Sequence, residues 1–309
     1  MKHNSGFTLI QMSIVLVIIG LLVGGVLVGQ NLIQAAAISA QISQISKYQQ
    51  AVINFQTKYN GYLPGDIPNP YATNYGFQTR GQWQGEGNGD GILTGNCSNT
   101  QWSGDGSQQG SGELAVFWQD LSTAGLIDTH IGTGANYPNI SAPTNTSLSS
   151  TPSIYNWLPT AKLGQGNFVY VMSLNNINYF VVQLVSNIGW DLESTGTVGS
   201  GANAMTVQQA YSIDTKIDDG LPQSGSVTAC GDDYDVYQAL GGYPIMAAWA
   251  AGKGLAGAGG NNCVPTTSST PYLSTNCYDN NNVAGTETYS IAKNANAMNC
   301  ALSFQFQTQ

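Results

Sequence analysis

The sequence predicts an α+β protein in which one long N-terminal helix packs on a small antiparallel sheet and long loops join the other elements. Three observations lead to this fold class. A helical pattern runs without a break from Phe7 to Tyr59, and two β-rich runs form a hairpin near the middle of the chain. Gly, Asn, Ser and Thr dominate the segments between these elements, which is typical of loops.

The first half of the predicted helix, residues 7–29, is apolar and carries no formal charge. About 20 apolar residues in a helix span a bilayer, so this half predicts a membrane anchor. Lys2 precedes it, which favours a cytoplasmic N-terminus and places the rest of the chain on the far side, in the periplasm of a two-membrane bacterium. Two other interpretations remain open: a secretory signal cleaved near Ala35–Ala37, and a buried core helix.

The second half, residues 30–61, continues the helix with an amphipathic pattern. Polar residues, Gln41 and Gln44 among them, are expected on the face opposite the apolar one. Asn60 and Gly61 predict the end of the helix, and the Leu-Pro-Gly-Asp segment that follows predicts a turn. The apolar face consists of Ile33, Ala37, Ile38, Ile42, Ile45, Tyr48, Val52, Phe55 and Tyr59. The whole helix would be about 80 Å long, which favours a stem over a cleaved signal.

The remaining residues, 62–309, are expected to form one head. A helix is predicted near 113–121, with Ser111 as its cap and Gly125 as its stop. The runs 168–174 and 179–185 predict a β-hairpin joined by residues 175–178.

A second helix of the head is predicted from Thr206, which forms a capping-box pattern with Gln209, to a stop at Gly220. Residues 76–112 and 130–160, and the segment from Ala250 onward, are predicted as loops, and the last of these has few large apolar residues.

The charge distribution argues against several classes of function. Of the 309 residues only 8% are charged, and 17 acidic residues against 8 basic ones give a net charge of −9. All the acidic residues lie at or after Asp66, so the head offers no basic surface for nucleic acid. With 2 histidines and no nucleophile, P-loop or dinucleotide motif, the chain is expected to be structural and not an enzyme.

A glycine-rich segment suggests calcium. Glu86, Asn88 and Asp90 alternate with glycines and resemble the first half of an EF-hand loop, which binds calcium through side-chain oxygens. The twelfth position is Cys97, so a complete EF-hand is excluded and further ligands must come from elsewhere. Solvated loop acids are the alternative, both here and at two other acidic clusters, Asp214, Asp218 and Asp219, and Asp232, Asp233 and Asp235.

The chain has 5 cysteines, and none of them has C-x-x-C spacing. An oxidising periplasm favours disulfides, at most two within the chain, and their pairing is left open by the spacing. The candidates are Cys97, Cys230, Cys263, Cys277 and Cys300.

The N-terminus matches a known pattern. Lys2 lies in a short leader, Gly6 precedes Phe7, Thr8–Ile10 follow, and the apolar run continues over 14–29. This segment resembles the type IV pilin and type II secretion pseudopilin family. The Leu-Pro-Gly-Asp turn and the segment 213–220 are similar, more loosely, to pilin-like proteins.

The resemblance implies a pilin-like fold and four parts: a leader at 1–6, a membrane and filament-core half at 7–29, an amphipathic half at 30–61, and a periplasmic or extracellular head at 62–309. It implies that a prepilin peptidase cleaves after Gly6 and that Phe7 is then N-methylated. The implied partners are other pilin or pseudopilin subunits and an inner-membrane assembly platform, and the large neutral head favours a minor subunit.

One residue departs from the family pattern. The fifth residue after the cleavage point is usually Glu, whereas here it is Gln11, which cannot neutralise a neighbour's N-terminal amine. Two interpretations of Gln11 remain open: a tolerated substitution, and a subunit that lies at the filament tip or is present in low copy number. Two further alternatives are a surface adhesin whose head binds a glycan or protein, and an exported enzyme.

Overall fold

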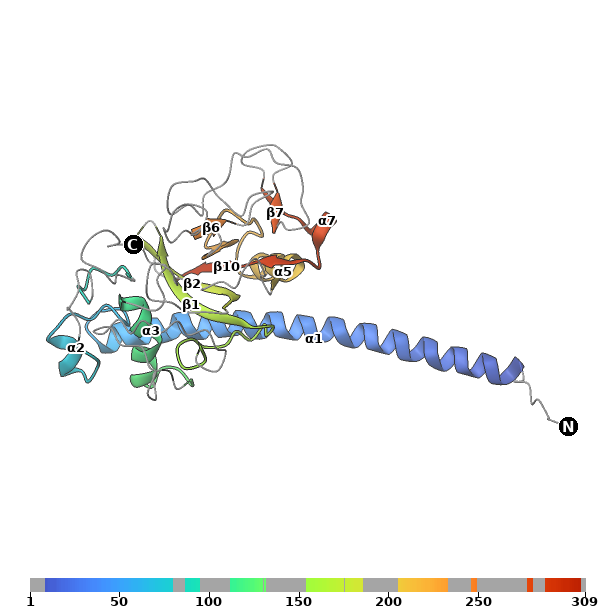
Figure 1. Cartoon of the computed structure of the whole chain (residues 1–309), viewed down its shortest axis with the longest axis horizontal. Helices are drawn as coiled ribbons and strands as arrows, with labels where there is room; N and C mark the ends of the chain where they lie inside the picture. The colour runs from blue at the N-terminus through green and yellow to red at the C-terminus, as the bar shows by residue number, and fades with distance from the viewer. Residues whose placement is uncertain are drawn as a thin grey trace.

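The computed structural model has a long helix that projects from a head formed by the rest of the chain (Figure 1). The structure describes residues 9–79, 87–94, 112–129, 131, 154–174, 176–185, 205–232, 246–248, 277–279 and 287–306. Within these residues the chain combines helices with a small antiparallel sheet, as the predicted α+β class requires.

The projecting helix is α1 (Leu9–Lys58), which contains 50 residues and is therefore about 75 Å long. It ends where the sequence predicts, because Asn60 and Gly61 both adopt positive φ angles, of 58° and 87°. The amide of Gly61 donates to the carbonyl of Gln56 over 2.7 Å, which satisfies one of the last carbonyls of the helix.

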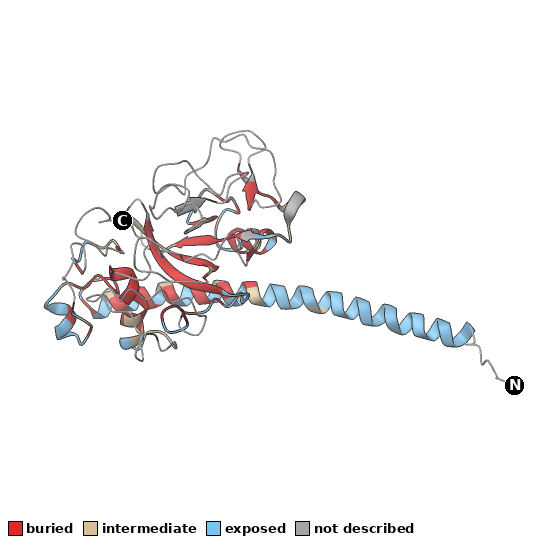
Figure 2. Cartoon of the chain, in the orientation of Figure 1, coloured by how far each residue is buried: buried red, intermediate tan, exposed pale blue. Residues whose placement is uncertain are grey.

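The two halves of α1 lie in different surroundings (Figure 2). Its N-terminal half is exposed, whereas its C-terminal half lies against the head. The buried residues of α1 are Ile38, Gln41, Gln44, Ile45, Tyr48, Ala51, Val52 and Phe55. The amphipathic half is thus part of the core of the head.

The predicted positions of Gln41 and Gln44 are wrong, because both lie on the buried face. Gln44 accepts the amide of Lys162 (2.9 Å) and donates to the carbonyl of Thr160 (2.8 Å), and Gln41 accepts the amide of Leu163 (3.0 Å). These glutamines therefore bind three backbone groups of residues 160–163 and attach that segment of the head to the stem.

The main sheet has the order β1-β2-β10-β4, with antiparallel neighbours. Its strands are β1 (Asn167–Leu174), β2 (Ile177–Leu184), β10 (Leu302–Gln305) and β4 (Val227–Thr228). The predicted hairpin is confirmed, but its connection is shorter than the predicted residues 175–178. Leu174 pairs with Ile177, so two residues form the turn, and Asn178 belongs to β2.

The helices of the head are α2 (Tyr71–Asn74), α3 (Gly112–Thr123), α5 (Val207–Ile217) and α7 (Ile291–Asn294). The capping box of α5 is confirmed, because Thr206 Oγ1 accepts the amide of Gln209 and the Gln209 side chain accepts the amide of Thr206. α3 lies where the sequence predicts it, but the proposed cap Ser111 lies outside the described residues.

Short strand pairs complete the described part of the head. They are β3 (Met205–Thr206) with β9 (Met298–Cys300), β5 (Cys230–Asp232) with β6 (Met246–Ala248), and β7 (Tyr278–Asp279) with β8 (Thr288–Tyr289).

Aromatic side chains connect the stem, α3 and the sheet. The rings of Tyr48 on α1 and Trp118 on α3 lie 4.8 Å apart, and both lie beside Phe180 of β2. All three side chains are buried, so this cluster fixes the amphipathic half of α1 on the head.

Candidate functional site

The exposed half of α1 is the candidate functional surface of the described chain. Its apolar side chains face solvent in the isolated chain, with Leu9 86% and Leu21 73% exposed. Keeping one such side chain in water costs about 1.5–3 kcal/mol relative to burying it. α1 is also the one described helix that is long and apolar enough to cross a membrane, because an 18-residue stretch of it has a mean hydropathy of 2.7. This surface therefore needs lipid or protein around it.

Small residues interrupt that apolar surface. Gly20, Gly24, Gly25 and Gly29 have open space where a side chain would begin. Such positions let a second helix approach the backbone closely, which is how small residues favour helix association in membranes.

The residues that the family resemblance singles out lie at or near the start of this helix. Gly6 and Phe7 lie outside the described residues, so their roles stay predictions. Gln11 lies on the exposed half of α1, in the apolar segment. Its predicted part in assembly is untested by the structure of a single chain.

A pair of buried carboxyl groups joins the stem to the head. Asp66 follows the turn after α1, Glu113 lies in the first turn of α3, and their side chains are 1% and 0% exposed. Asp66 accepts the amides of Gly89 (2.7 Å) and Gly91 (2.8 Å). We call Asp66 and Glu113 the junction pair.

Glu113, the other member of the junction pair, binds both ends of the same glycine-rich loop. Glu113 accepts the amide of Gly87 over 2.7 Å and that of Thr94 over 2.8 Å. Gly65 brings the stem turn close to α3, because a Cβ atom at that position would lie 2.5 Å from the carbonyl oxygen of Glu113. The junction pair therefore holds the glycine-rich loop against the turn that follows the stem.

This arrangement changes the interpretation of the predicted calcium loop. Gly87, Gly89 and Gly91 all have positive φ angles, and their amides point to the junction pair. Asn88 and Asp90 point outward and bind each other over 2.7 Å. Glu86 lies outside the described residues, so calcium binding by Glu86, Asn88 and Asp90 stays a prediction.

Burial dominates the electrostatics of the junction pair. It raises the pKa of Asp66 to about 6, although the amides of Gly91 and Gly89 act in the opposite direction. Burial, and then the negative charge of Asp66, raise the pKa of Glu113 well above its usual range. The interaction between the two side chains lowers the pKa of Asp66 and raises the pKa of Glu113, so a proton shared by the pair favours Glu113.

Local sequence patterns do not reveal this pair. They place Asp66 in a turn and Glu113 at the start of a helix, and both local predictions are correct. The missing signal was the alternation of glycines at 87, 89 and 91, because three inward amides require an acceptor on another segment.

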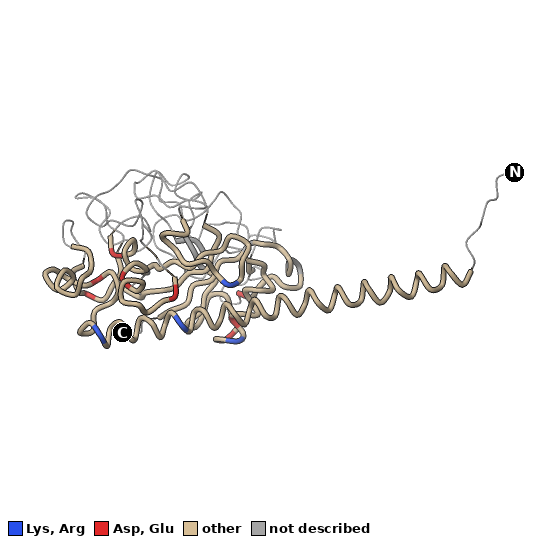
Figure 3. The backbone as a smooth tube through the Cα atoms, turned by 90° about the horizontal axis from the view of Figure 1, so that it is seen from below, with Lys and Arg blue, Asp and Glu red and all other residues tan. Residues whose placement is uncertain are grey.

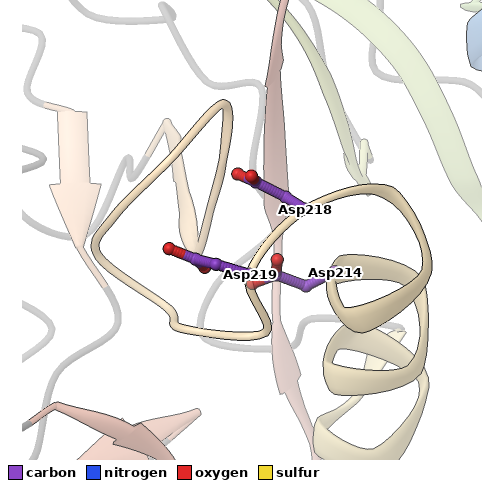
Figure 4. Close-up of side chains that lie close together, drawn as sticks. All are labelled: Asp214, Asp218 and Asp219. Atoms are coloured by element: carbon purple, nitrogen blue, oxygen red, sulfur yellow. The ribbon is translucent and has the colours of Figure 1, made fainter.

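A second acidic cluster lies where α5 ends (Figure 4), and carboxylate oxygens of Asp214, Asp218 and Asp219 lie within 4.8 Å of one another. Each acid also binds nearby groups of the protein. Asp214 accepts the hydroxyl of Tyr289 (2.7 Å) and the amide of Gly220 (3.1 Å), and burial raises its pKa to about 6.

The other two acids of this cluster organise the segment that follows α5. Asp218 accepts the amides of Ser226 and Val227, and Asp219 accepts the amide of Leu221 and the hydroxyl of Ser224. In the third predicted cluster, Asp232 lies in β5, whereas residues 233 and 235 lie outside the described residues.

One disulfide is present in the described part of the chain. Cys277 and Cys300, whose Cα atoms lie 5.0 Å apart, are bonded and link the start of β7 to the end of β9. Cys230 lies in β5, and Cys97 and Cys263 lie outside the described residues.

Comparison with known proteins finds no matching family model, no matching curated protein and no matching solved structure. The chain's function must therefore be inferred from its own sequence and geometry.

Proposed function

We propose that this protein is a structural subunit of the pilin or pseudopilin type, a minor component of a type IV pilus or a type II secretion filament. One observation carries the proposal: a single helix presents exposed apolar side chains over one half and is part of the head's core over the other. Before assembly the apolar half would lie in the inner membrane, with a cytoplasmic N-terminus and a periplasmic head.

The same apolar half would hold the filament together. When a subunit leaves the lipid, its exposed side chains must be covered by the stems of other copies or of related subunits. Gly20, Gly24, Gly25 and Gly29 would permit close contact between those stems. In this proposal a prepilin peptidase trims the chain after Gly6, Phe7 is methylated, and an inner-membrane platform drives assembly.

Calcium belongs to the proposal as a structural ligand of the head. Asn88 and Asp90 are exposed and supply oxygen atoms, the donors that calcium prefers. Asp214, in contrast, is buried and already bound by Tyr289. The glycine-rich loop is therefore the preferred place, with Glu86 as its third ligand.

The position of the N-terminus in the mature protein tests the proposal. Burial in α1 begins at Ile38, so a secretory signal cleaved near Ala37 would leave the packing of the head intact. Intact mass and N-terminal sequencing of the cellular protein should give a mature chain that begins at methylated Phe7.

Two matched variants identify the peptidase. Gly6→Leu should leave the full-length form in the membrane, because the prepilin peptidase needs a small residue before the cut. Ala36→Leu, which changes the cleavage region of the competing signal, should leave trimming unchanged. A mature chain that begins near Ile38, or normal trimming of Gly6→Leu, contradicts the proposed function.

An adhesin is the second candidate, because exposed tyrosines lie at the far end of the head. Tyr71 and Tyr75 are 49% and 39% exposed, at α2, which lies opposite the N-terminus (Figure 1). Tyr71 is stacked on Tyr62, which holds its ring in place. Fixed aromatic rings with a polar tip suit the contact of a glycan or a protein.

Adhesion assays with surface-displayed full-length protein distinguish this candidate from the first. Tyr71→Ala with Tyr75→Ala should reduce binding to host glycans or cells if the head is an adhesin. Tyr155→Ala, which removes an equally exposed tyrosine elsewhere, is the control. Equal adhesion by all three proteins would eliminate the adhesin.

A further inference from the structure

The charges of the stem are all of one sign. α1 contains two charged residues, Lys47 and Lys58, and both are exposed. Figure 3 colours the charged positions along the backbone, and the sequence of α1 contains no acidic residue. Eleven residues at 3.6 per turn make about three turns, so the two lysines share one side of the helix about 16 Å apart. We call them the stem lysine pair.

These lysines have no acidic partner within the described part of the chain. α1 has no Asp or Glu to pair with them at helical spacing. The ammonium group of Lys58 lies 5.1 Å from the centre of the Tyr59 ring, and neither lysine forms an ion pair with a described carboxylate. Within the part of the chain that the structure describes, both charges therefore remain available to another molecule.

The lipid surface lies too far away to be that molecule. Lys47 comes 18 residues after the apolar segment ends at Gly29, a distance of about 27 Å along the helix. Electrostatic attraction to anionic headgroups falls off over about 8 Å at physiological salt. Lys58 lies still farther along the stem.

The head has the complementary charge. All 17 acidic residues of the chain lie at or after Asp66, and Asp90, Asp128 and Asp219 are exposed among the described residues. One copy therefore offers a basic stem and an acidic head, two different surfaces that attract each other. A contact between two unlike surfaces of the same chain repeats without closing unless a ring forms, and so produces a helical assembly.

We propose that the stem lysine pair binds exposed carboxylates on the head of a second copy of this chain, such as Asp90, Asp128 or Asp219. This inference rests on the proposed function and adds a contact outside the apolar stem. Charged pairs at such exposed positions select partner and register more than they add affinity. The contact would therefore align the heads while the apolar stems supply the cohesion.

The test uses the full-length chain, purified in detergent and allowed to assemble when the detergent is removed. Sedimentation measures the assembled fraction at low and at high salt. Lys47→Glu with Lys58→Glu should reduce that fraction about tenfold at low salt, because like charges then face each other. Lys162→Glu with Lys216→Glu, which reverses two exposed lysines of the head, is the matched control and should assemble normally.

A milder variant addresses the stability of the stem. Lys58 is in the last turn of α1, where an acidic residue is unfavourable in itself. Lys47→Gln with Lys58→Gln removes the charges without placing an acid there, and it should assemble less well than the native chain and better than the reversed one. Carbodiimide cross-linking of a mixture of isotope-labelled and unlabelled copies should join a stem lysine to a head carboxylate of another copy.

The outcomes separate the two proposals. If the native chain never assembles, this inference fails, because it requires a contact between copies, whereas the proposed function of a minor subunit is decided by the N-terminus of the mature chain. If the native chain assembles and the charge-reversed chain assembles equally well at every salt concentration, this inference alone is overturned. It is also overturned if charge reversal abolishes binding to vesicles of anionic lipid while assembly is unchanged.

Discussion

The junction pair should make the head less stable as pH rises. In the folded chain burial raises the pKa of Asp66 to about 6 from an ordinary value of 3.8, and it raises the pKa of Glu113 as well. A carboxyl group whose pKa is raised by folding binds protons more tightly in the folded state. Its contribution to stability is therefore complete below the unfolded pKa and is lost as pH rises through the folded pKa.

The size of the effect follows from the shift. One pKa unit corresponds to about 1.4 kcal/mol, so Asp66 alone accounts for a decrease of at most about 3 kcal/mol between pH 4 and pH 7. Glu113 acts in the same direction. Asp214, whose pKa is also raised to about 6, adds to the slope and must be separated from the junction pair.

The slope of the free energy of unfolding against pH can be measured by chemical unfolding of the full-length chain in detergent. Tryptophan fluorescence follows the unfolding at each pH. Trp118 is 1% exposed in the core and should report the loss of packing. Glu113→Gln keeps an N–H donor toward Asp66 at every pH, so the slope should flatten. In Asp214→Asn the slope due to the junction pair should persist. In the double variant, Glu113→Gln with Asp214→Asn, little slope should remain.

Two results would refute this reasoning. The first is a stability that rises from pH 4 to pH 7 in the native chain, because it would mean that the buried carboxyls are stabilised in their charged form. The second is an unchanged slope in Glu113→Gln, which would place the titrating groups elsewhere in the molecule.

Three further predictions concern the disulfide, calcium and the stem. Cys277→Ser with Cys300→Ser should lower the free energy of unfolding by about 3 kcal/mol, because the bond closes a chain segment with a separation of 23 residues; denaturation with and without reductant measures this. If calcium binds the glycine-rich loop, chelation should lower the melting temperature of the native chain but not of Asp90→Ala, and equal melting with and without calcium would leave Asp90 as a solvated acid. If Gln11 marks a tip subunit, labelled protein should lie at filament ends, and Gln11→Glu should enter the shaft; label along the whole native filament would contradict the tip role.

Local signals made several elements predictable. The stem and its end at Asn60 and Gly61 follow from apolar spacing and from the tolerance of those residues for positive φ. The hairpin follows from two β-rich runs, and the start of α5 from the reciprocal bonds of Thr206 and Gln209. In each case the residues that determine the structure are close in sequence.

The contacts that local patterns missed are long-range. β10 pairs with β2 and β4, although it lies in a C-terminal segment predicted as loop and poor in core residues. Leu302 and Phe304 are nevertheless buried, because a central strand needs only a few apolar residues when its partners cover it. Gln41 and Gln44 appeared to be surface residues until the structure showed the backbone groups that they bind.

The unbroken course of α1 has a geometric consequence for the whole molecule. Each helical residue turns the chain by about 100° and advances it by about 1.5 Å, so the facing direction of the head is set by the number of residues between the apolar segment and Ile38. One residue inserted there would rotate the head by about 100° about the helix axis and move it by only about 1.5 Å along that axis. Seven inserted residues would leave the head facing within about 20° of its original direction and would move it by about 10 Å along the helix axis. The number of residues between Gly29 and Ile38 thus sets the angle about the helix axis between the apolar segment and the head.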